Sequence, residues 1–333
     1  MNQKISVIIV NWNGKHHLQK CLSSLSSQTF KDFETILVDN GSTDGSVEFV
    51  KEKFAYIKII RLERNKGFCE GNNIGFQQAT GEFIALLNND TRADKHWLQE
   101  LLSAIYDKPE IGICASCIVN YFNPEILDTA GDGYDISGVG FRIGHGLSVS
   151  NYQEKRFVFG GCACAVLYRR SMLEKIGFFD EDFFATGEDI DLNFRARLSG
   201  YKCVYAPKAL VSHKMNQTVG LDSDFAIYHA RRNVEYTYFK NMPALLILAT
   251  FPFHLLYELL TVFEAIRLGK LKIFIKAKSD FLKNLSHVLK KRRLIQQHRN
   301  ITLSEVFALF SWNYLWQKIR LTFLSKNLSL ITK

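Results

Sequence analysis

Short uninterrupted apolar runs alternate with helix-like stretches through the first 120 residues. The apolar runs predict strands at residues 6–10, 34–38, 57–62, 83–87 and 111–119. Runs of this length are typical of strands buried on both faces, and strand–helix alternation favours a mostly parallel sheet flanked by helices. We therefore predict an α/β fold with its ligand site at the carboxyl ends of the strands.

The remainder of the body is less regular. Residues 121–156 are rich in Gly and Tyr without clear periodicity, which predicts a long loop or an irregular hairpin over the site. Regular elements return as strands at 163–168, 202–205 and 210–212 and as helices at 171–176, 188–199 and 225–239. We place the catalytic domain at residues 1–241 and a helical, basic extension at 242–333.

The segment 243–263 is strongly apolar but contains Pro252, His254 and Glu258. A membrane-spanning helix needs about 20 predominantly apolar residues. We therefore expect a segment that lies on a membrane or re-enters it, and a helical packing extension with a solvated charged face is the alternative.

Charge is concentrated in the tail. Residues 264–333 hold 15 Lys or Arg against 3 Asp or Glu, whereas residues 1–263 hold 27 against 30. A basic, aromatic-rich tail beside an apolar segment favours contact with an anionic membrane surface. Nucleic acid is the other anionic partner, but no recognised nucleic-acid motif accompanies the tail, so we expect no nucleic-acid binding.

The seven cysteines are scattered and odd in number, which argues against a disulfide framework. Cys114 with Cys117 and Cys162 with Cys164 have the spacing of zinc ligands, but their apolar surroundings favour buried thiols. The chain opens directly into an apolar strand with no secretory leader. We expect the catalytic body in the cytosol.

The strand at 83–87 runs directly into Asn88, Asn89 and Asp90. Oxygen ligands with a single carboxylate suit a hard divalent cation that bridges to phosphate. A polar turn is the alternative, because Asn and Asp are favoured in turns whatever the function.

The strands at 34–38 and 57–62 also end in polar residues. Asp39 directly follows the first, where its carboxylate can accept hydrogen bonds from a nucleobase or ribose. After the second come Asn65, Lys66 and Gly67, and then Asn72. The glycines in this stretch are four apart, which matches neither a dinucleotide fingerprint nor a Walker A loop and also suits close packing of a helix on the sheet.

A second set of carboxylates, Glu188 and Asp189, lies among aromatic residues at a predicted helix start. A carboxylate held against aromatic surface is a candidate general base for a hydroxyl. Helix capping with Thr186 is the alternative. His213 follows the strand at 210–212 and can complete a metal shell with Asp90, although a lone His is more often structural.

Taken in order, these segments resemble family 2 glycosyltransferases of the GT-A fold, especially the bacterial rhamnosyltransferase-like branch. The matching stretches are residues 7–13, 38–44, 65–68, 71–73, 87–90, 160–161 and 187–189. The resemblance spans residues 5 to about 240 and weakens in the tail.

The resemblance implies inverting sugar transfer from a nucleoside-diphosphate sugar. In that reading Asp39 lies near the base, Asp90 and His213 hold Mg²⁺ or Mn²⁺ at the diphosphate, and Asp189, beside Glu188, deprotonates the acceptor hydroxyl. The residues expected around the donor are Asn11, Asp39, Asn65, Lys66, Gly67, Asn72, Asn88, Asn89, Asp90 and Gly161. One position departs from the pattern, because Asn88 stands where many relatives have an acid, which implies that metal binds together with the donor.

We therefore expect a metal-dependent glycosyltransferase at the cytoplasmic face of the cell membrane, peripheral or monotopic. Its acceptor would be a lipid-linked or cell-surface glycan, and family likeness points to rhamnose as the sugar. Direct transfer to polyprenyl phosphate is one alternative. The other is a catalytically silent, nucleotide-sugar-binding partner, which the neutral Asn88 keeps open.

Overall fold

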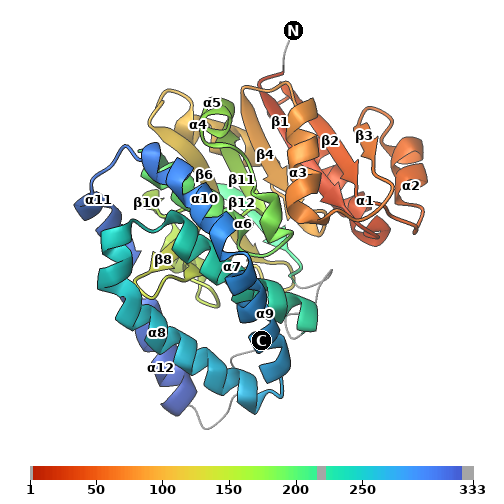
Figure 1. Cartoon of the computed structure of the whole chain (residues 1–333). Coiled ribbons are helices and arrows are strands. Elements are labelled where there is room, and N and C mark those ends of the chain that lie inside the picture. Colours follow the sequence, from red (N-terminus) through yellow and green to blue (C-terminus); the bar gives the residue numbers. More distant parts are fainter. Residues whose placement is uncertain (1–2, 216–222, 325–333) are drawn as a thin grey trace. The chain divides into compact units, whose positions relative to one another are not determined.

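The structure is a computed structural model that describes residues 3–215 and 223–324. The chain divides into two compact units (Figure 1). The first contains Met1–Asp132, Arg142–Ala196 and Tyr201–Thr218, and the second contains Gly133–Phe141, Arg197–Gly200 and Val219–Lys333. The boundary near residue 241 stays a prediction, since compactness does not reveal which helices take part in catalysis. The last nine residues of the predicted extension lie outside the described residues.

A ten-stranded sheet forms the first unit, in the order β10-β12-β6-β11-β4-β1-β2-β3, with β5 paired to β12 and β7 to β6. Its strands are β1 (Ile5–Asn11), β2 (Phe33–Asp39), β3 (Lys58–Arg61), β4 (Phe83–Leu87), β5 (Thr91–Ala93), β6 (Ile111–Asn120), β7 (Leu127–Thr129), β10 (Arg156–Val158), β11 (Ala165–Arg169) and β12 (Lys202–His213).

The sheet is mixed. β1 is parallel to β2 and β4, and β2 is parallel to β3, whereas β11 is antiparallel to both β4 and β6. The α/β fold class is confirmed, and the five strands predicted in the first 120 residues are all present. Two short strands were expected at 202–205 and 210–212. They form one strand, β12, whose register against β6 shifts between Ala206 and Leu210.

The segment 121–156 has more regular structure than its composition predicts. It contains β7, β8 (Asp132–Asp135), β9 (Gly140–Arg142), the 3-10 helix η1 (Val149–Tyr152) and the start of β10. Many of its glycines have positive φ, including Gly131 and Gly138. Short strands linked by such turns carry no long period, which is why the pattern of apolar residues does not reveal them.

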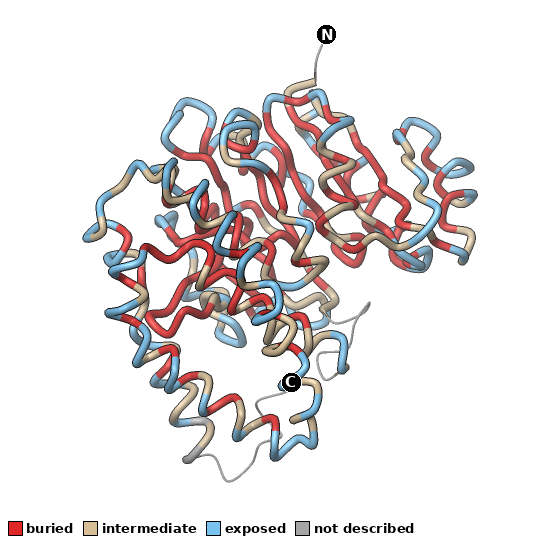
Figure 2. Tube along the Cα trace, in the orientation of Figure 1, coloured by how far each residue is buried: buried red, intermediate tan, exposed pale blue. Residues whose placement is uncertain are grey.

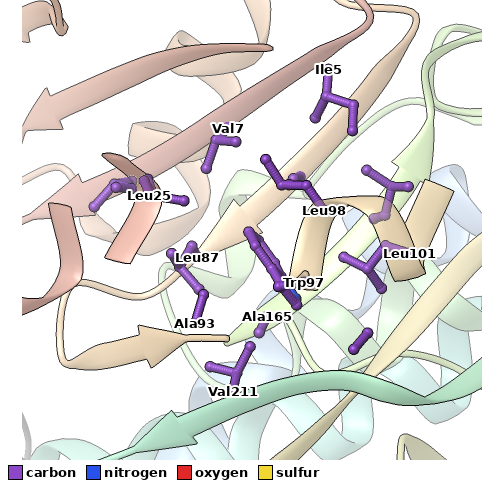
Figure 3. Close-up of a cluster of buried hydrophobic side chains, with 14 of the residues drawn as sticks. Ile5, Val7, Leu25, Leu87, Ala93, Trp97, Leu98, Leu101, Ala165 and Val211 are labelled. Carbon is purple, nitrogen blue, oxygen red and sulfur yellow. The ribbon is translucent and has the colours of Figure 1, made fainter. Parts of the chain in front are cut away.

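Helices cover the sheet of the first unit (Figure 1). They are α1 (Lys15–Ser26), α2 (Ser46–Lys53), α3 (Gly67–Gln78), α4 (Trp97–Ile105), α5 (Arg170–Ile176) and α6 (Glu188–Leu198), with the 3-10 helix η2 (Glu181–Phe183). Between α4 and the sheet, Trp97 is fully buried in an apolar cluster and donates its indole N–H to Ser116 Oγ at 2.9 Å (Figure 3). α3 packs closely, because a Cβ at Gly75 would lie 2.5 Å from Ile8 Cγ2.

The second unit is mainly helical. It contains α7 (Asp224–Asn241), α8 (Ala244–Arg267), α9 (Leu271–Lys283), α10 (Leu285–Gln297), α11 (Leu303–Phe307) and α12 (Asn313–Leu324), with a small sheet β13-β8-β9 in which β13 is Phe310–Ser311. α8 continues through Pro252, so the residues expected to interrupt this segment do not end the helix. All seven cysteines are buried and free, as predicted.

Candidate active site

The carboxyl ends of β1, β2 and β4 lie side by side, and their polar residues form one hydrogen-bonded row. Asn11 and Asp39 are register partners. Asn89 donates to Asn11 Oδ1 at 2.7 Å, and the Asn11 amide lies 3.5 Å from Asp39 Oδ1. All three are buried. Gly14 is required beside this row, because a Cβ there would lie 2.2 Å from Asn89 Nδ2.

The loop before α3 is held by a residue that sequence reasoning passed over, Asn40. Its amide donates to Asn65 Oδ1 at 3.0 Å and to the Gly67 carbonyl at 2.9 Å, and its oxygen accepts from the Lys66 backbone N–H at 2.9 Å. Asn65 and Gly67 therefore shape this loop. Asn72, 1% exposed, donates to the Phe68 carbonyl at 2.9 Å within the same helix.

Lys66 and Asn88 offer groups that are not fully buried. The Lys66 ammonium is about one-third exposed and pairs with Glu70 at 2.6 Å. The Asn88 side chain is half-buried, while its backbone N–H donates to the Cys164 carbonyl at 2.8 Å. The Lys66 ammonium can approach a phosphate, and the Asn88 amide can reach a bound ligand.

His213 lies between two buried carboxylates. Its Nδ1 is 2.7 Å from Asp128 Oδ2, and its Nε2 is 3.5 Å from Asp90 Oδ2. Asp128 also binds Arg142, with 2.6 Å between Oδ1 and the guanidinium. With its Nδ1 proton held by Asp128, the imidazole can give up the Nε2 proton when a cation binds and offer that lone pair, which is the arrangement of metal-binding histidines.

The electrostatics of these groups favour ionised carboxylates. Burial alone would raise the pKa of Asp90, but the hydrogen bond and charge of His213 bring it below its usual value. Burial likewise opposes ionisation of Asp128, but hydrogen bonds from His145 and His213 and the charge of Arg142 hold its pKa well below the usual range. A carboxylate and an imidazole that converge are a donor set that fits Mg²⁺ or Mn²⁺.

The second set of carboxylates begins α6 and follows a strained turn. Phe184, Thr186 and Gly187 have φ values of 62°, 72° and 83°. A β-branched threonine in the left-handed region is uncommon, and such backbone conformations cluster at functional sites. In the first turn of α6, Asp189 accepts hydrogen bonds from the backbone N–H groups of Ala163 at 3.2 Å and Ile190 at 2.8 Å.

Glu188 differs from Asp189 in its partners. Glu188 is 7% exposed, and its Oε2 is buried with no hydrogen-bond partner among the described residues. Burial, together with the charge of Asp189, raises the pKa of Glu188 to about 8. Burial also raises the pKa of Asp189, against the hydrogen bonds from Ala163 and Ile190. Near neutral pH Glu188 is therefore protonated, and its carboxyl group can donate a hydrogen bond.

One short segment, residues 160–164, joins the two sets. Asp189 accepts from the N–H of Ala163, and the neighbouring Cys164 carbonyl accepts from Asn88, two residues before Asp90. Gly161 is held by Asn193, which accepts from its N–H at 3.3 Å and donates to its carbonyl at 3.2 Å. The predicted metal-side and base-side residues thus attach to neighbouring positions of the same segment.

Sequence reasoning missed the carboxylates of the irregular segment. Asp128 holds His213, and the buried Asp132 accepts a hydrogen bond from Asn193 at 3.3 Å. Burial and the charge of Asp189 raise the pKa of Asp132 well above its usual value. Acidic residues four apart within a glycine-rich stretch were the available signal, but the absence of periodicity there predicts only a loop or an irregular hairpin.

Lys214 is a further residue that the sequence did not single out. Its N–H donates to the Asp90 carbonyl at 3.1 Å, and its ammonium lies 2.9 Å from His17 Nδ1. Burial, with the charge of Lys214, lowers the pKa of His17 to about 4. The neutral imidazole can therefore accept a hydrogen bond from the ammonium, which holds this cation at His17.

A second cluster of potential metal ligands lies in the other unit. Atoms of Glu235, His254 and Glu258 lie within 4.8 Å of one another. The ammonium of Lys278 already binds both carboxylates, at 2.5 Å to Glu235 and 2.6 Å to Glu258. Because a protein cation fills this cluster, we interpret it as structural.

Two solved structures share the fold of this chain. GalNAc-T7, crystallised with UDP, GalNAc and Mn²⁺, superposes with a TM-score of 0.58 at 20% identity, over 71% of this chain and 47% of that one. TarS 1-349 of S. aureus superposes with a TM-score of 0.53 at 18% identity, over 88% of this chain and 90% of that one. These likenesses define the GT-A fold.

Sequence comparison assigns the chain to one family within this fold. The model of the family Glycosyl transferase family 2 matches residues 6–177 of the sequence, and the chain belongs to this family. The rhamnosyltransferase-like resemblance is confirmed at low identity: N-acetylglucosaminyl-diphospho-decaprenol L-rhamnosyltransferase of Mycobacterium tuberculosis is 25% identical over 69% of this chain and 82% of its own length.

Other relatives differ in length and product. Glycosyltransferase AglE of Haloferax volcanii is 27% identical over 63% of this chain and 66% of its own length. Poly-beta-1,6-N-acetyl-D-glucosamine synthase of Staphylococcus epidermidis is 25% identical over 65% of this chain and 51% of its own length. The chain thus spans one half to two thirds of the length of these two relatives.

Proposed function

We propose that this protein is an inverting glycosyltransferase that moves a sugar from a nucleoside-diphosphate sugar to a hydroxyl of a lipid-linked or cell-surface glycan. The observation that carries the proposal is the attachment of two different carboxylate sets to the segment 160–164. One set, Asp90 with His213, suits a cation, and the other, at Asp189, suits proton transfer.

Donor binding is assigned to the polar row at the carboxyl ends of the strands. Asp39 is the acceptor for the base or ribose, and Asn11 and Asn89 hold the row in place. Lys66 and Lys214 provide positive charge for the diphosphate. Asn65, Gly67, Asn72 and Gly161 act through the backbone shape that their hydrogen bonds maintain.

Asp90 and His213 are the residues that would hold Mg²⁺ or Mn²⁺, and a bound ion of this kind neutralises charge that develops on a leaving diphosphate. Asp128 fixes the imidazole so that Nε2 faces Asp90. Asn88 adds a neutral amide where an acid would strengthen cation binding, so we expect cation and donor to bind together.

Asp189 is assigned as the general base. It accepts the proton of the acceptor hydroxyl while that oxygen forms a bond to the anomeric carbon. The bond from this carbon to the diphosphate breaks, and the nucleoside diphosphate leaves with the electron pair. A pKa raised by burial makes Asp189 a better proton acceptor than an exposed aspartate. The protonated Glu188 is assigned as a hydrogen-bond donor to a substrate oxygen.

The acceptor and the location are proposed from the similarity of this chain to a relative. The name of the M. tuberculosis relative supports a lipid-linked acceptor and a rhamnosyl donor. The cytoplasmic face of the membrane is the location that we propose for this reaction. Direct transfer to polyprenyl phosphate differs only in the acceptor. The neutral Asn88 favours the second candidate, a silent nucleotide-sugar-binding partner.

The test measures thermal stabilisation by a panel of nucleotide sugars with and without Mn²⁺ or Mg²⁺, then turnover with each class of acceptor. One donor should raise the melting temperature selectively by mass action. Asp189→Asn should keep that shift but lose at least about a hundredfold in turnover. Glu174→Gln, an exposed carboxylate on α5, serves as the matched control. Unchanged turnover in Asp189→Asn would remove the residue from the mechanism, and donor binding without turnover of any acceptor would favour the silent partner.

A further inference from the structure

α8 has its polar and apolar faces reversed relative to a helix of a soluble protein. Every exposed residue from 244 to 266 is apolar. The most prominent are Leu245 (63% exposed), Leu248 (74%), Leu255 (49%), Leu259 (59%), Phe263 (44%) and Ile266 (56%). We call these six residues the outer face of α8, and the exposed part of this helix is visible in Figure 2.

The opposite face of α8 carries its polar residues. Thr250, His254, Tyr257 and Thr261 are all buried within the second unit. His254 Nδ1 lies 2.8 Å from the Ser137 carbonyl oxygen, and its Nε2 bonds to a carboxylate of α7. Side chains on this face therefore have protein partners. Among the parts of the chain that the structure describes, the exposed residues of the outer face are apolar, whereas a soluble protein would put charged residues there.

Two acidic residues of α8 are also held on the inner side. Glu264 Oε2 lies 3.2 Å from Arg231 and 2.6 Å from Lys318, and Glu258 pairs with Lys278. These ion pairs come from α7, α12 and α9, so three helices fix the orientation of α8 about its axis. The exposure of the outer face is thus built into the packing of this unit.

Length and composition alone would not decide the role of α8. It has one window apolar enough to cross a membrane, and a soluble core helix passes the same test if it is mostly buried. Only 33% of that window is buried. A continuous apolar stripe along a helix of 24 residues, about 36 Å long, is larger than the patches that monomeric soluble proteins normally expose.

We infer that the outer face of α8 docks onto a membrane surface, with the helix lying in the plane of the interface. The occupant is an anionic lipid bilayer, because basic side chains accompany the apolar ones. Arg267 lies 5.7 Å from the ring centre of Phe263. In α9, exposed Lys272 and Lys276 flank Ile275, which is 56% exposed. Apolar residues beside lysines and arginines are the signature of interfacial helices.

The same packing argues against a spanning orientation. A helix that crosses the bilayer needs apolar surroundings on all sides, whereas α8 is bound on its inner side by helices that carry exposed lysines. Pro252 has no backbone N–H, so the Leu248 carbonyl lacks its usual helical hydrogen bond. Both residues are exposed. Head-group water can satisfy that carbonyl at the interface. The inference deepens the proposed lipid-linked acceptor, but vesicle binding needs neither donor nor acceptor.

The test is flotation of the whole chain with vesicles of phosphatidylcholine, alone or with phosphatidylglycerol. The outer-face variant is Leu248→Gln with Leu255→Gln and Leu259→Gln. Its matched control replaces exposed apolar residues of the first unit, Phe122→Gln with Leu147→Gln and Phe157→Gln, which are 74%, 52% and 60% exposed. All six side chains are exposed, so melting temperatures without vesicles should change little, which verifies folding.

We expect wild type and control to float with anionic vesicles and the outer-face variant to lose at least about tenfold in partition coefficient. Lys272→Gln with Lys276→Gln should lower binding to anionic vesicles by roughly fivefold per lysine. Equal flotation of the outer-face variant and wild type would overturn the inference. So would a wild-type dimer that the variant converts to a monomer without any flotation, since a second copy would then cover the face.

The orientation of α8 relative to the membrane plane is measured separately, by fluorescence quenching. The native thiols are buried, so a fluorophore can be attached selectively at Leu255→Cys. Lipids with a quencher near the head group should quench it more than lipids with a quencher at the chain end. The reverse order would overturn the in-plane orientation. Because these assays contain no sugar, their failure would leave the transferase proposal standing, and a failed transferase assay would leave membrane docking standing.

Discussion

The two units of this protein each contain a buried histidine beside carboxylates, and the two clusters differ in the residues that provide positive charge. In the first unit His213 lies between Asp128 and Asp90. In the second, His254 binds Glu235, and Lys278 adds an ammonium to the same carboxylate. The residue types are those expected of a metal site in both places.

What differs is the source of the compensating charge. Lys278 neutralises the second cluster from within the protein, which makes it a set of ion pairs that ties α7, α8 and α9 together. In the first cluster, His213 is the one ion-pair partner that Asp90 has among the described residues. Histidine and carboxylates alone therefore do not mark a metal site. A carboxylate whose one ion-pair partner among the described residues is a histidine is the better indicator.

The largest effect is expected from neutralising one acid in each cluster. Asp90→Asn should reduce turnover roughly a hundredfold to a thousandfold, because it removes the carboxylate that would hold the cation. A chelator should reduce wild-type turnover similarly. Glu258→Gln should leave turnover within about twofold. Initial rates at saturating Mn²⁺ measure both, and comparable losses in the two variants would refute the distinction.

The second cluster should instead govern stability. The hydrogen bond from His254 and the charge of Lys278 lower the pKa of Glu235 to about 2, although burial opposes this. A lowered folded-state pKa contributes stability that is complete above the unfolded value of 4.5 and is lost as the pH falls toward 2. Glu235→Gln should cost about 3 kcal/mol at pH 7, and less below pH 4.5.

Urea unfolding at several pH values measures this difference. The pKa of His254, which Glu235 raises against the effect of burial, works in the other direction. Its contribution is complete below pH 6.5 and is lost as the pH rises through the folded-state pKa. A gap between wild type and Glu235→Gln that stays constant from pH 7 to pH 3 would contradict the assigned ion pair. The exposed Glu174→Gln is the control.

A smaller effect is expected for Asp128, which orients the His213 imidazole but would not itself contact the cation. Asp128→Asn should weaken Mn²⁺ affinity about tenfold to a hundredfold, because residues behind a metal ligand tune it by that amount. Calorimetric titration with the donor present measures it. Asp128→Glu should recover part of the loss. Unchanged affinity would show that His213 needs no partner at Nδ1.

The smallest effect belongs to an exposed ion pair. Lys66 and Glu70 are 2.6 Å apart but each about one-third exposed. Glu70→Gln should change the free energy of unfolding by less than about 0.5 kcal/mol, since solvent screens the pair. Donor affinity should not fall, because Lys66 keeps its charge. A loss comparable to that of Glu235→Gln would mean that burial is not what separates the two kinds of pair.

Much of the first unit follows from local pattern. The apolar run 83–87 coincides with β4, and the polar residues after it emerge at the sheet edge together with Asn11 and Asp39. A strand buried on both faces needs a continuous apolar run, and parallel neighbours end at the same edge. Adjacency of these residues could therefore be predicted before any contact was known.

The Nδ1 partner of His213 could not be predicted in this way. Asp128 lies 85 residues earlier, in a segment whose short strands and glycine turns leave no period. In α8, His254 looks in the sequence like an interruption of an apolar segment, whereas in the structure it lies on the buried side with Thr250 and Thr261. Neither fact is encoded by neighbours in the sequence.

By itself, the sequence determined the strands β1, β2, β3, β4 and β6, the polar residues at their ends and the apolar character of residues 243–263. Only the tertiary structure decided which carboxylates receive a cation from the protein and which side of α8 faces outward. The reason is physical: periodicity depends on residues a few positions apart, whereas charge compensation and burial depend on segments that meet only when the chain has folded.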